Sequence, residues 1–134
     1  MTTRKKHFLV VLLILSLPVF TSAQKAYDAY YYKGSTQNIS VSFTLADGYI
    51  AACELKTTDL TSKKTSSFLP ETGAPDEMKR MKFYHYSTSG KKFTDYFIID
   101  GMEEMYDSLP KIIYGKYYFN NSSYPLVLTI NTCK

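Results

Sequence analysis

The sequence has 134 residues and a formal net charge of +4, with 45% hydrophobic and 16% aromatic residues. The aromatic residues are 13 Tyr and 8 Phe, with no Trp. This length fits one domain, and the modest charge, which comes largely from the first 23 residues, argues against a nucleic-acid-binding protein.

Residues 1–23 have the pattern of a cleaved secretory signal peptide. Arg4, Lys5 and Lys6 precede an apolar run over residues 8–15, and small residues follow at 21–23. The run is shorter than the ~20 residues that a membrane-spanning helix needs. Cleavage removes three of the 16 basic residues and no acidic ones, which leaves 13 basic against 12 acidic residues. We therefore expect export to the periplasm or the extracellular medium, a single β-rich domain over residues 24–134, and no membrane insertion after signal removal.

Two cysteines, Cys53 and Cys133, remain in the predicted mature chain. An exported chain enters an oxidising compartment, so this pair predicts one disulfide. The closed loop would span about 80 residues and would stabilise the fold by about 4–5 kcal/mol through the lost entropy of the unfolded chain. The alternative is two free thiols or an intermolecular bridge.

Most of the mature chain alternates apolar and polar residues in short stretches, which turn-forming residues separate. This pattern predicts eight strands, at residues 26–33, 38–46, 49–57, 64–69, 80–87, 92–99, 111–119 and 123–131. Residues 100–109 have apolar side chains at helical spacing and predict one short helix that Pro110 ends. The expected fold is all-β, an antiparallel up-and-down barrel of about eight strands (lipocalin-like) with one short helix. A two-sheet β-sandwich is the alternative.

The predicted turns also set the strand registers. A three-residue loop at 46–48 keeps the apolar residues of the first hairpin on one face and places Cys53 inside. A turn at 121–122 would pair Tyr117 with Leu126 in the last hairpin. In the middle hairpin, a loop at 88–90 would pair His85 with Phe93 and Phe83 with Asp95, which puts His85 and Asp95 on a diagonal.

This middle register predicts that His85 and Asp95 meet on the inner face of the barrel. A buried charge needs a partner, and each of these side chains is the natural partner of the other. One interpretation is a satisfied structural pair, joined by a Tyr hydroxyl. The other is a polar anchor at the bottom of a ligand pocket.

Two surface features are candidate binding regions. Tyr84 and Tyr86 share the outward phase of their strand with Arg80 and Lys82, and such aromatic and basic patches serve in recognition. The polar segment after the fourth strand is a candidate contact loop. Its residues include Pro70, Glu71, Gly73, Pro75, Asp76 and Glu77.

The sequence carries no motif for catalysis, metal binding or cofactor binding. His85 is the only His of the predicted mature chain, which excludes a two-His metal motif, and there is no G-x-S-x-G nucleophile motif or glycine-rich phosphate loop. We therefore expect no enzyme, no catalytic residue, no metal and no cofactor.

The leading hypothesis is a small exported, non-catalytic binding protein. Its partner would be another protein, as for a periplasmic or secreted inhibitor or an immunity protein, and not a nucleic acid. The alternative is a barrel that carries a small apolar or aromatic ligand. In size, export signal and Tyr-rich strand pattern, the mature chain resembles small secreted bacterial barrels, among them lipocalin-like proteins and periplasmic lysozyme-inhibitor barrels. The likeness is one of architecture.

Overall fold

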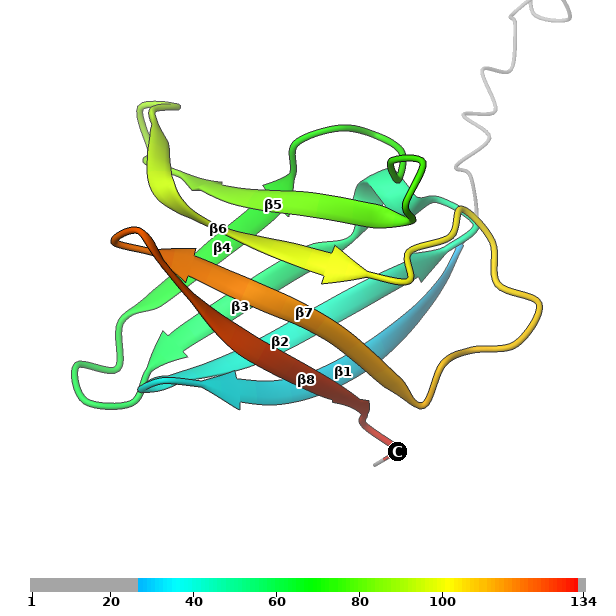
Figure 1. Cartoon of the computed structure of the whole chain (residues 1–134), viewed down its shortest axis with the longest axis horizontal. Helices are drawn as coiled ribbons and strands as arrows, with labels where there is room; N and C mark the ends of the chain where they lie inside the picture. Colours follow the sequence, from blue (N-terminus) through cyan, green and yellow to red (C-terminus); the bar gives the residue numbers. More distant parts are fainter. Residues whose placement is uncertain (1–26, 133–134) are drawn as a thin grey trace, which may run out of the picture.

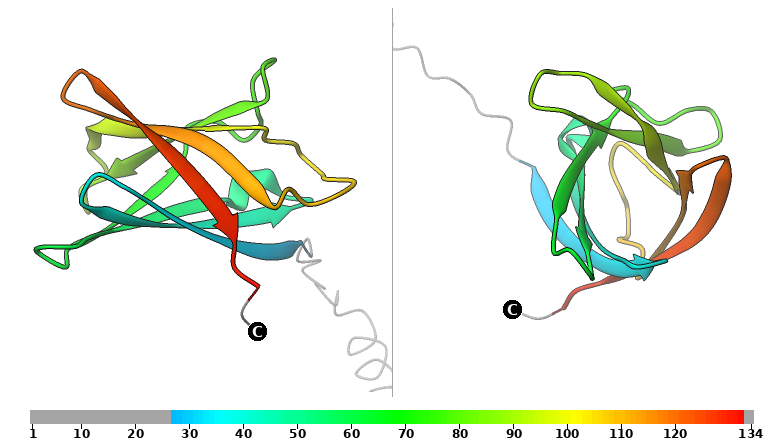
Figure 2. Two further views of the ribbon diagram at one scale, coloured as in Figure 1. Left: turned by 60° about the horizontal axis from the view of Figure 1, so that its bottom comes forward. Right: turned by 90° about the vertical axis from the view of Figure 1, so that its left-hand side faces the viewer.

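The computed structural model describes residues 27–132, which form one closed antiparallel barrel (Figures 1 and 2). Each strand pairs with the next along the chain, and β8 closes the barrel on β1. The strands are β1 (Asp28–Thr36), β2 (Ile39–Asp47), β3 (Glu54–Asp59), β4 (Thr65–Pro70), β5 (Arg80–Tyr86), β6 (Lys92–Asp100), β7 (Ile112–Phe119) and β8 (Ser122–Ile130). The predicted all-β, eight-stranded barrel is confirmed. Residues 1–23 of the predicted signal peptide, and Cys133, lie outside the described residues.

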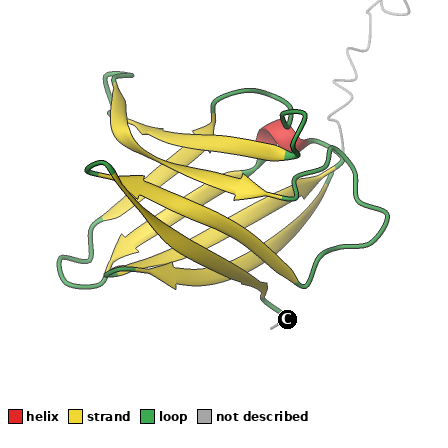
Figure 3. Ribbon diagram, in the orientation of Figure 1, coloured by secondary structure: helices red, strands yellow, loops and turns green. Residues whose placement is uncertain are grey.

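The two ends of the barrel differ in their connections. At the hairpin end, on the left of Figure 1, short turns at residues 37–38, 60–64, 87–91 and 120–121 join consecutive strands. At the loop end, on the right, longer segments at 48–53, 71–79 and 101–111 connect the strands. The segment 48–53 contains η1 (Ile50–Ala52), a single 3-10 turn, drawn in red in Figure 3.

Inward-facing side chains fill the barrel with apolar groups. Five aromatic residues have less than 2% of their surface exposed, and they come from five strands: Tyr32, Phe43, Phe68, Phe83 and Phe97. Several of these rings meet edge to face, with ring centroids 5.8 Å apart for Phe43 and Phe83 and 4.9 Å apart for Phe68 and Phe97. Alternate residues are buried over Val41–Leu45 of β2 and over Asp95–Ile99 of β6, and this alternation puts Phe43 and Phe97 inside the barrel.

The prediction of a helix over residues 100–109 is wrong, because this segment is an irregular loop. Gly101 adopts φ +71°, which is outside the right-handed helical region. The backbone N–H of Tyr106 donates to the Asp47 carboxylate at 2.9 Å, and the Glu104 carbonyl accepts from the Gly48 N–H at 3.2 Å. These tertiary bonds replace helical ones. Met102 is still buried against the core, so the loop covers this end of the barrel.

Of the three predicted registers, two are wrong and the middle one is correct only next to its turn, whereas most inward-facing residues were correctly predicted. The β2–β3 pairing starts at Thr44 and Glu54, because η1 occupies the expected hairpin and buries Ile50. In the last hairpin Tyr117 lies opposite Tyr124 instead of Leu126. The middle hairpin has the predicted three-residue loop at 88–90, with the Ser87 N–H donating to the Lys91 carbonyl at 2.8 Å.

Candidate functional site

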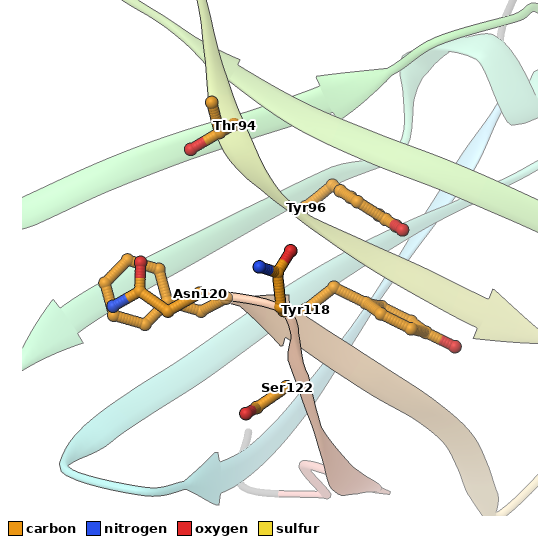
Figure 4. A pocket seen from close by; sticks show the side chains of 7 residues that line it. Thr94, Tyr96, Tyr118, Asn120 and Ser122 are labelled. Carbon is orange, nitrogen blue, oxygen red and sulfur yellow. The ribbon is translucent and has the colours of Figure 1, made fainter.

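Three tyrosines form a row across the outer surface of β5, β6 and β7. Tyr84 lies opposite Tyr96, and Tyr96 lies opposite Tyr118. The ring centroids of Tyr84 and Tyr96 are 5.1 Å apart. Those of Tyr96 and Tyr118 are 4.8 Å apart with an interplanar angle of 9°, and these two rings lie side by side in Figure 4. All three side chains are half-buried, so part of each ring remains available to a partner.

Two lysines, Lys82 on β5 and Lys92 on β6, lie over rings of this row. The ammonium group of Lys92 lies 3.7 Å from the centroid of the Tyr84 ring, and that of Lys82 lies 5.6 Å from the centroid of Tyr96. At these distances the ring faces attract the cations. We call the residues Lys82, Tyr84, Lys92, Tyr96 and Tyr118 together the tyrosine face.

The structure brings together only part of the predicted aromatic and basic patch. Tyr84 and Lys82 belong to the tyrosine face, and Tyr86 is exposed at the hairpin end of β5. Arg80 instead pairs with Asp76 at the loop end, with 3.2 Å between guanidinium nitrogen and carboxylate oxygen. The sequence analysis missed Tyr96 and Tyr118. Their positions on the outward phase of β6 and β7 were the available signal.

The candidate contact loop is braced by its own hydrogen bonds. The Asp76 carboxylate accepts from the backbone N–H of Met78 at 2.9 Å and of Arg80 at 2.8 Å, and these bonds hold the Asp76 pKa below its usual range. Pro70 ends β4, while Gly73 and Glu77 are exposed. The loop reaches the tyrosine face at Glu71, whose carboxylate lies 3.4 Å from the Lys92 ammonium.

A pocket of about 460 Å³ adjoins the tyrosine face at the hairpin end (Figure 4). It lies where β6 and β7 separate, because their pairing ends at Tyr96 and Tyr118. Its lining has hydroxyl, amide and aromatic side chains and no ionisable carboxylate or amine: Thr94, Tyr96, Tyr118, Phe119, Asn120, Asn121 and Ser122.

Inside the barrel, near the hairpin end, His85 and Asp95 lie together. His85 Nδ1 is 3.2 Å from Asp95 Oδ1, and the hydroxyl of Tyr117 donates to Asp95 Oδ2 at 2.8 Å. Nδ1 makes no aligned hydrogen bond within the described part of the chain, so the His85–Asp95 contact is one of proximity. The His85 ring stacks on Phe93 and meets Phe68 edge to face.

A register irregularity in the middle hairpin brings these groups together. The β5–β6 pairing shifts between Tyr84 and Tyr86, so that His85 alone faces the β6 residues Phe93–Asp95. One imidazole therefore contacts both the phenyl ring and the carboxylate.

The electrostatics of this cluster favour neutral side chains beside the carboxylate. Burial lowers the pKa of His85, the Asp95 charge opposes this effect, and Lys64 adds to it. Burial and the bond to Asp95 both raise the Tyr117 pKa, so the phenol keeps its proton and remains a donor. At neutral pH the imidazole is therefore uncharged, and within the cluster the Tyr117–Asp95 pair is hydrogen-bonded while His85 Nδ1 is not.

Cys53 lies in the core near the loop end as a free thiol with 1% of its surface exposed. Its Sγ accepts from the Ala46 N–H at 3.3 Å, and burial raises the thiol pKa to about 11. A thiol in this state is a poor nucleophile. The predicted disulfide partner, Cys133, lies outside the described residues.

Within residues 27–132, no group of three His, Cys, Asp or Glu side chains is arranged to hold a metal ion, and no helix is long and apolar enough to cross a membrane. No protein-family model matches the chain, and no curated protein and no solved structure is significantly similar to it.

Proposed function

We propose that this chain is a small exported, non-catalytic binding protein that contacts another protein through the tyrosine face. The observation that supports this proposal is the row of Tyr84, Tyr96 and Tyr118 on three adjacent strands. Tyrosine offers a large apolar ring and a hydroxyl on only two rotatable bonds, and it is enriched where proteins bind one another. In this proposal the predicted signal peptide of residues 1–23 is removed on export, and the two proteins meet in the periplasm or outside the cell.

The rigidity of this surface supports an inhibitor or immunity role in particular. The rings pack against each other and against lysine side chains, and they stand on strands whose inner faces are buried. A surface that is ordered before binding loses little conformational entropy in the complex, which favours tight association.

The alternative of a carrier for a small apolar ligand has less support. Five buried aromatic side chains occupy the inner faces of five strands, where such a ligand would have to sit. The 460 Å³ pocket is large enough for a small molecule, but it is lined by amides and hydroxyls as much as by rings.

A photo-crosslinking amino acid at Leu69 tests the proposal in living cells of the source organism. Leu69 lies opposite Tyr84 on the outer surface with 47% exposure, so the probe leaves the tyrosines intact. The control position is Val127, 46% exposed on β8. We expect one covalent adduct from position 69 and none from position 127.

The adduct's partner is then purified and its affinity is measured with two variants. Tyr96→Ala should weaken binding about tenfold or more, because truncating a central interface tyrosine costs more than ~1 kcal/mol. Tyr114→Ala, which removes an equally large side chain from the exposed surface of β7, should change the affinity less than about twofold. Equal losses for both variants, or no loss for Tyr96→Ala, would reject the tyrosine face.

A further inference from the structure

Charged residues are separated along the barrel axis. Of the 12 Asp and Glu residues, only Asp59 and Asp95 lie at the hairpin end, and the other ten lie in or beside the segments of the loop end. Lys63, Lys64 and Lys91 lie in hairpin-end turns. The predicted mature chain, with 13 basic and 12 acidic residues, is therefore close to neutral but has one basic end and one acidic end.

The two carboxylates at the hairpin end offset these lysines only in part: the Lys63 charge helps to lower the Asp59 pKa, but neither carboxylate forms an ion pair with a turn lysine. Asp59 accepts hydrogen bonds from the backbone N–H groups of Thr61 and Ser62, at 2.9 and 2.7 Å. Asp95 is buried inside the barrel and accepts from Tyr117. The ion pairs found within residues 27–132 involve none of the three turn lysines.

Exposed apolar side chains lie on the same end. Leu60 is 46% exposed, and Phe93 and Phe119 are each 45% exposed. They come from three different hairpins, so they are distributed around the rim of the barrel. The Leu60 N–H donates to the Asn38 carbonyl at 2.9 Å, which ties one turn to its neighbour. We call Leu60, Lys63, Lys64, Lys91, Phe93 and Phe119 together the basic rim.

Charge complementarity and this distribution favour an anionic bilayer as the occupant. Lysines attract acidic headgroups, and single Leu and Phe side chains beside them can enter the interfacial layer. An occupant that contacts all three apolar side chains has to reach three separate hairpins at once. A bilayer surface extends over the whole end of the barrel, so it contacts all three whatever the distances between them. The ten carboxylates at the far end are repelled by the same surface, so the barrel is oriented with its loop end away.

We propose that the basic rim docks this protein on the surface of an anionic lipid bilayer. The barrel itself stays outside the hydrocarbon layer, and only the rim side chains enter the headgroup region. The tyrosine face runs along the barrel wall and remains open to its protein partner in this orientation.

Sedimentation of the mature protein with lipid vesicles tests the inference. Vesicles that contain phosphatidylglycerol should bind the protein, and vesicles of pure phosphatidylcholine should not. Binding should weaken as salt rises to about 0.5 M, because salt screens the headgroup charge. The triple variant Lys63→Gln/Lys64→Gln/Lys91→Gln should bind about tenfold more weakly or worse, since each lysine near the surface contributes several-fold.

A matched triple variant separates the rim from overall charge. It removes the same three charges from exposed lysines on the barrel wall, namely Lys33→Gln, Lys56→Gln and Lys116→Gln. Its affinity for the vesicles should fall less than about threefold. Absence of binding to phosphatidylglycerol, or equal losses for the two triple variants, would overturn the proposal.

The apolar part of the rim has its own matched pair. Leu60→Ser should weaken vesicle binding several-fold, while Leu69→Ser, at 47% exposure on the wall, should not. The acidic loop end of a second copy is the competing occupant. Sedimentation velocity without lipid tests this alternative. If the protein forms oligomers that grow with concentration, and the lysine triple variant of the rim does not, the basic rim binds a second copy and the proposal is overturned.

Discussion

The cluster of Asp95, Tyr117 and His85 predicts a large loss of stability when its carboxylate is removed. Asp95→Ala deletes the acceptor that Tyr117 Oη contacts at 2.8 Å, and Asp95 has only 9% of its surface exposed. A hydrogen bond to a charged group contributes about 1.5–3 kcal/mol, and the phenol left without a partner adds about 1–3 kcal/mol of desolvation cost. Removing a buried charge offsets part of this sum. We expect a net loss of about 3 kcal/mol.

Urea unfolding of the mature protein, followed by far-UV circular dichroism, measures this loss. In thermal unfolding, about 3 kcal/mol corresponds to a Tm about 10–15 °C lower for a domain of this size. A loss below about 0.5 kcal/mol is what an exposed position gives, and it would show that the carboxylate is not buried and bonded as described.

A double-mutant cycle with Tyr117→Phe identifies the interaction responsible. This variant keeps the ring that stacks on Phe97 and removes only the hydroxyl, so it should lose about 1.5–2 kcal/mol. Once Asp95 is alanine, the hydroxyl has no acceptor, and its removal should cost nothing or restore some stability. The coupling between the two positions should therefore be at least about 1.5 kcal/mol, and simple additivity would refute the hydrogen bond as the cause.

Three other properties follow from the structure. Burial lowers the His85 pKa, so the imidazole binds a proton more weakly in the folded than in the unfolded state. The free energy of unfolding should therefore fall as the pH drops below about 6.5, the ordinary pKa of His. In urea titrations at several pH values, His85→Gln should reduce this dependence on pH. Gly115→Ala should lower stability by at least about 1–3 kcal/mol in the same assay, because its Cβ would lie 2.7 Å from both the carbonyl oxygen of Ile98 and Cδ1 of Ile99; an unchanged midpoint would contradict this close packing. Cys53, buried and with a pKa of about 11, should not react with iodoacetamide in the folded protein and should react after unfolding without reductant; no reaction after unfolding would establish the disulfide expected from the sequence.

The eight strands were predictable because one face of each is buried. Alternation along β2, as in Val41, Phe43 and Leu45, identifies both the strand and its inner face. The loop at 101–111 was not predictable in this way. Met102 and Tyr106 do pack at helical spacing against the core, but hydrogen bonds to Asp47 and Gly48, distant in sequence, determine the backbone.

Strand registers were less predictable than strand faces, since a shift of two residues leaves every side chain on the same face. In the last hairpin the turn is Asn120 and Asn121, with φ of 49° and 61°, instead of residues 121–122. Asn tolerates this left-handed region better than Ser, so turn chemistry, and not hydrophobic pattern, distinguishes the two registers.

The meeting of His85 and Asp95 was predictable despite an incomplete register. The pairing next to the turn, Tyr86 with Lys92, agrees with the predicted loop at 88–90. Beyond the irregularity the pairing differs by two residues, and Phe83 lies opposite Phe97 instead of Asp95. The two side chains still meet because both are on the inner face. The pairing shifts between Tyr84 and Tyr86, so His85 lies at the shift itself, opposite the β6 segment that contains Asp95.

The tyrosine row was harder to predict, because it depends on two registers at once. On β7, Lys116 and Tyr118 both face outward, so a shift of two residues would place Lys116 opposite Tyr96 and Tyr118 opposite Thr94. Hydrophobic burial cannot distinguish these pairings, since neither outward residue enters the core. The register between β6 and β7 is therefore set by close packing inside the barrel, such as Ile99 against Gly115, and this packing brings Tyr118 beside Tyr96 on the outer surface.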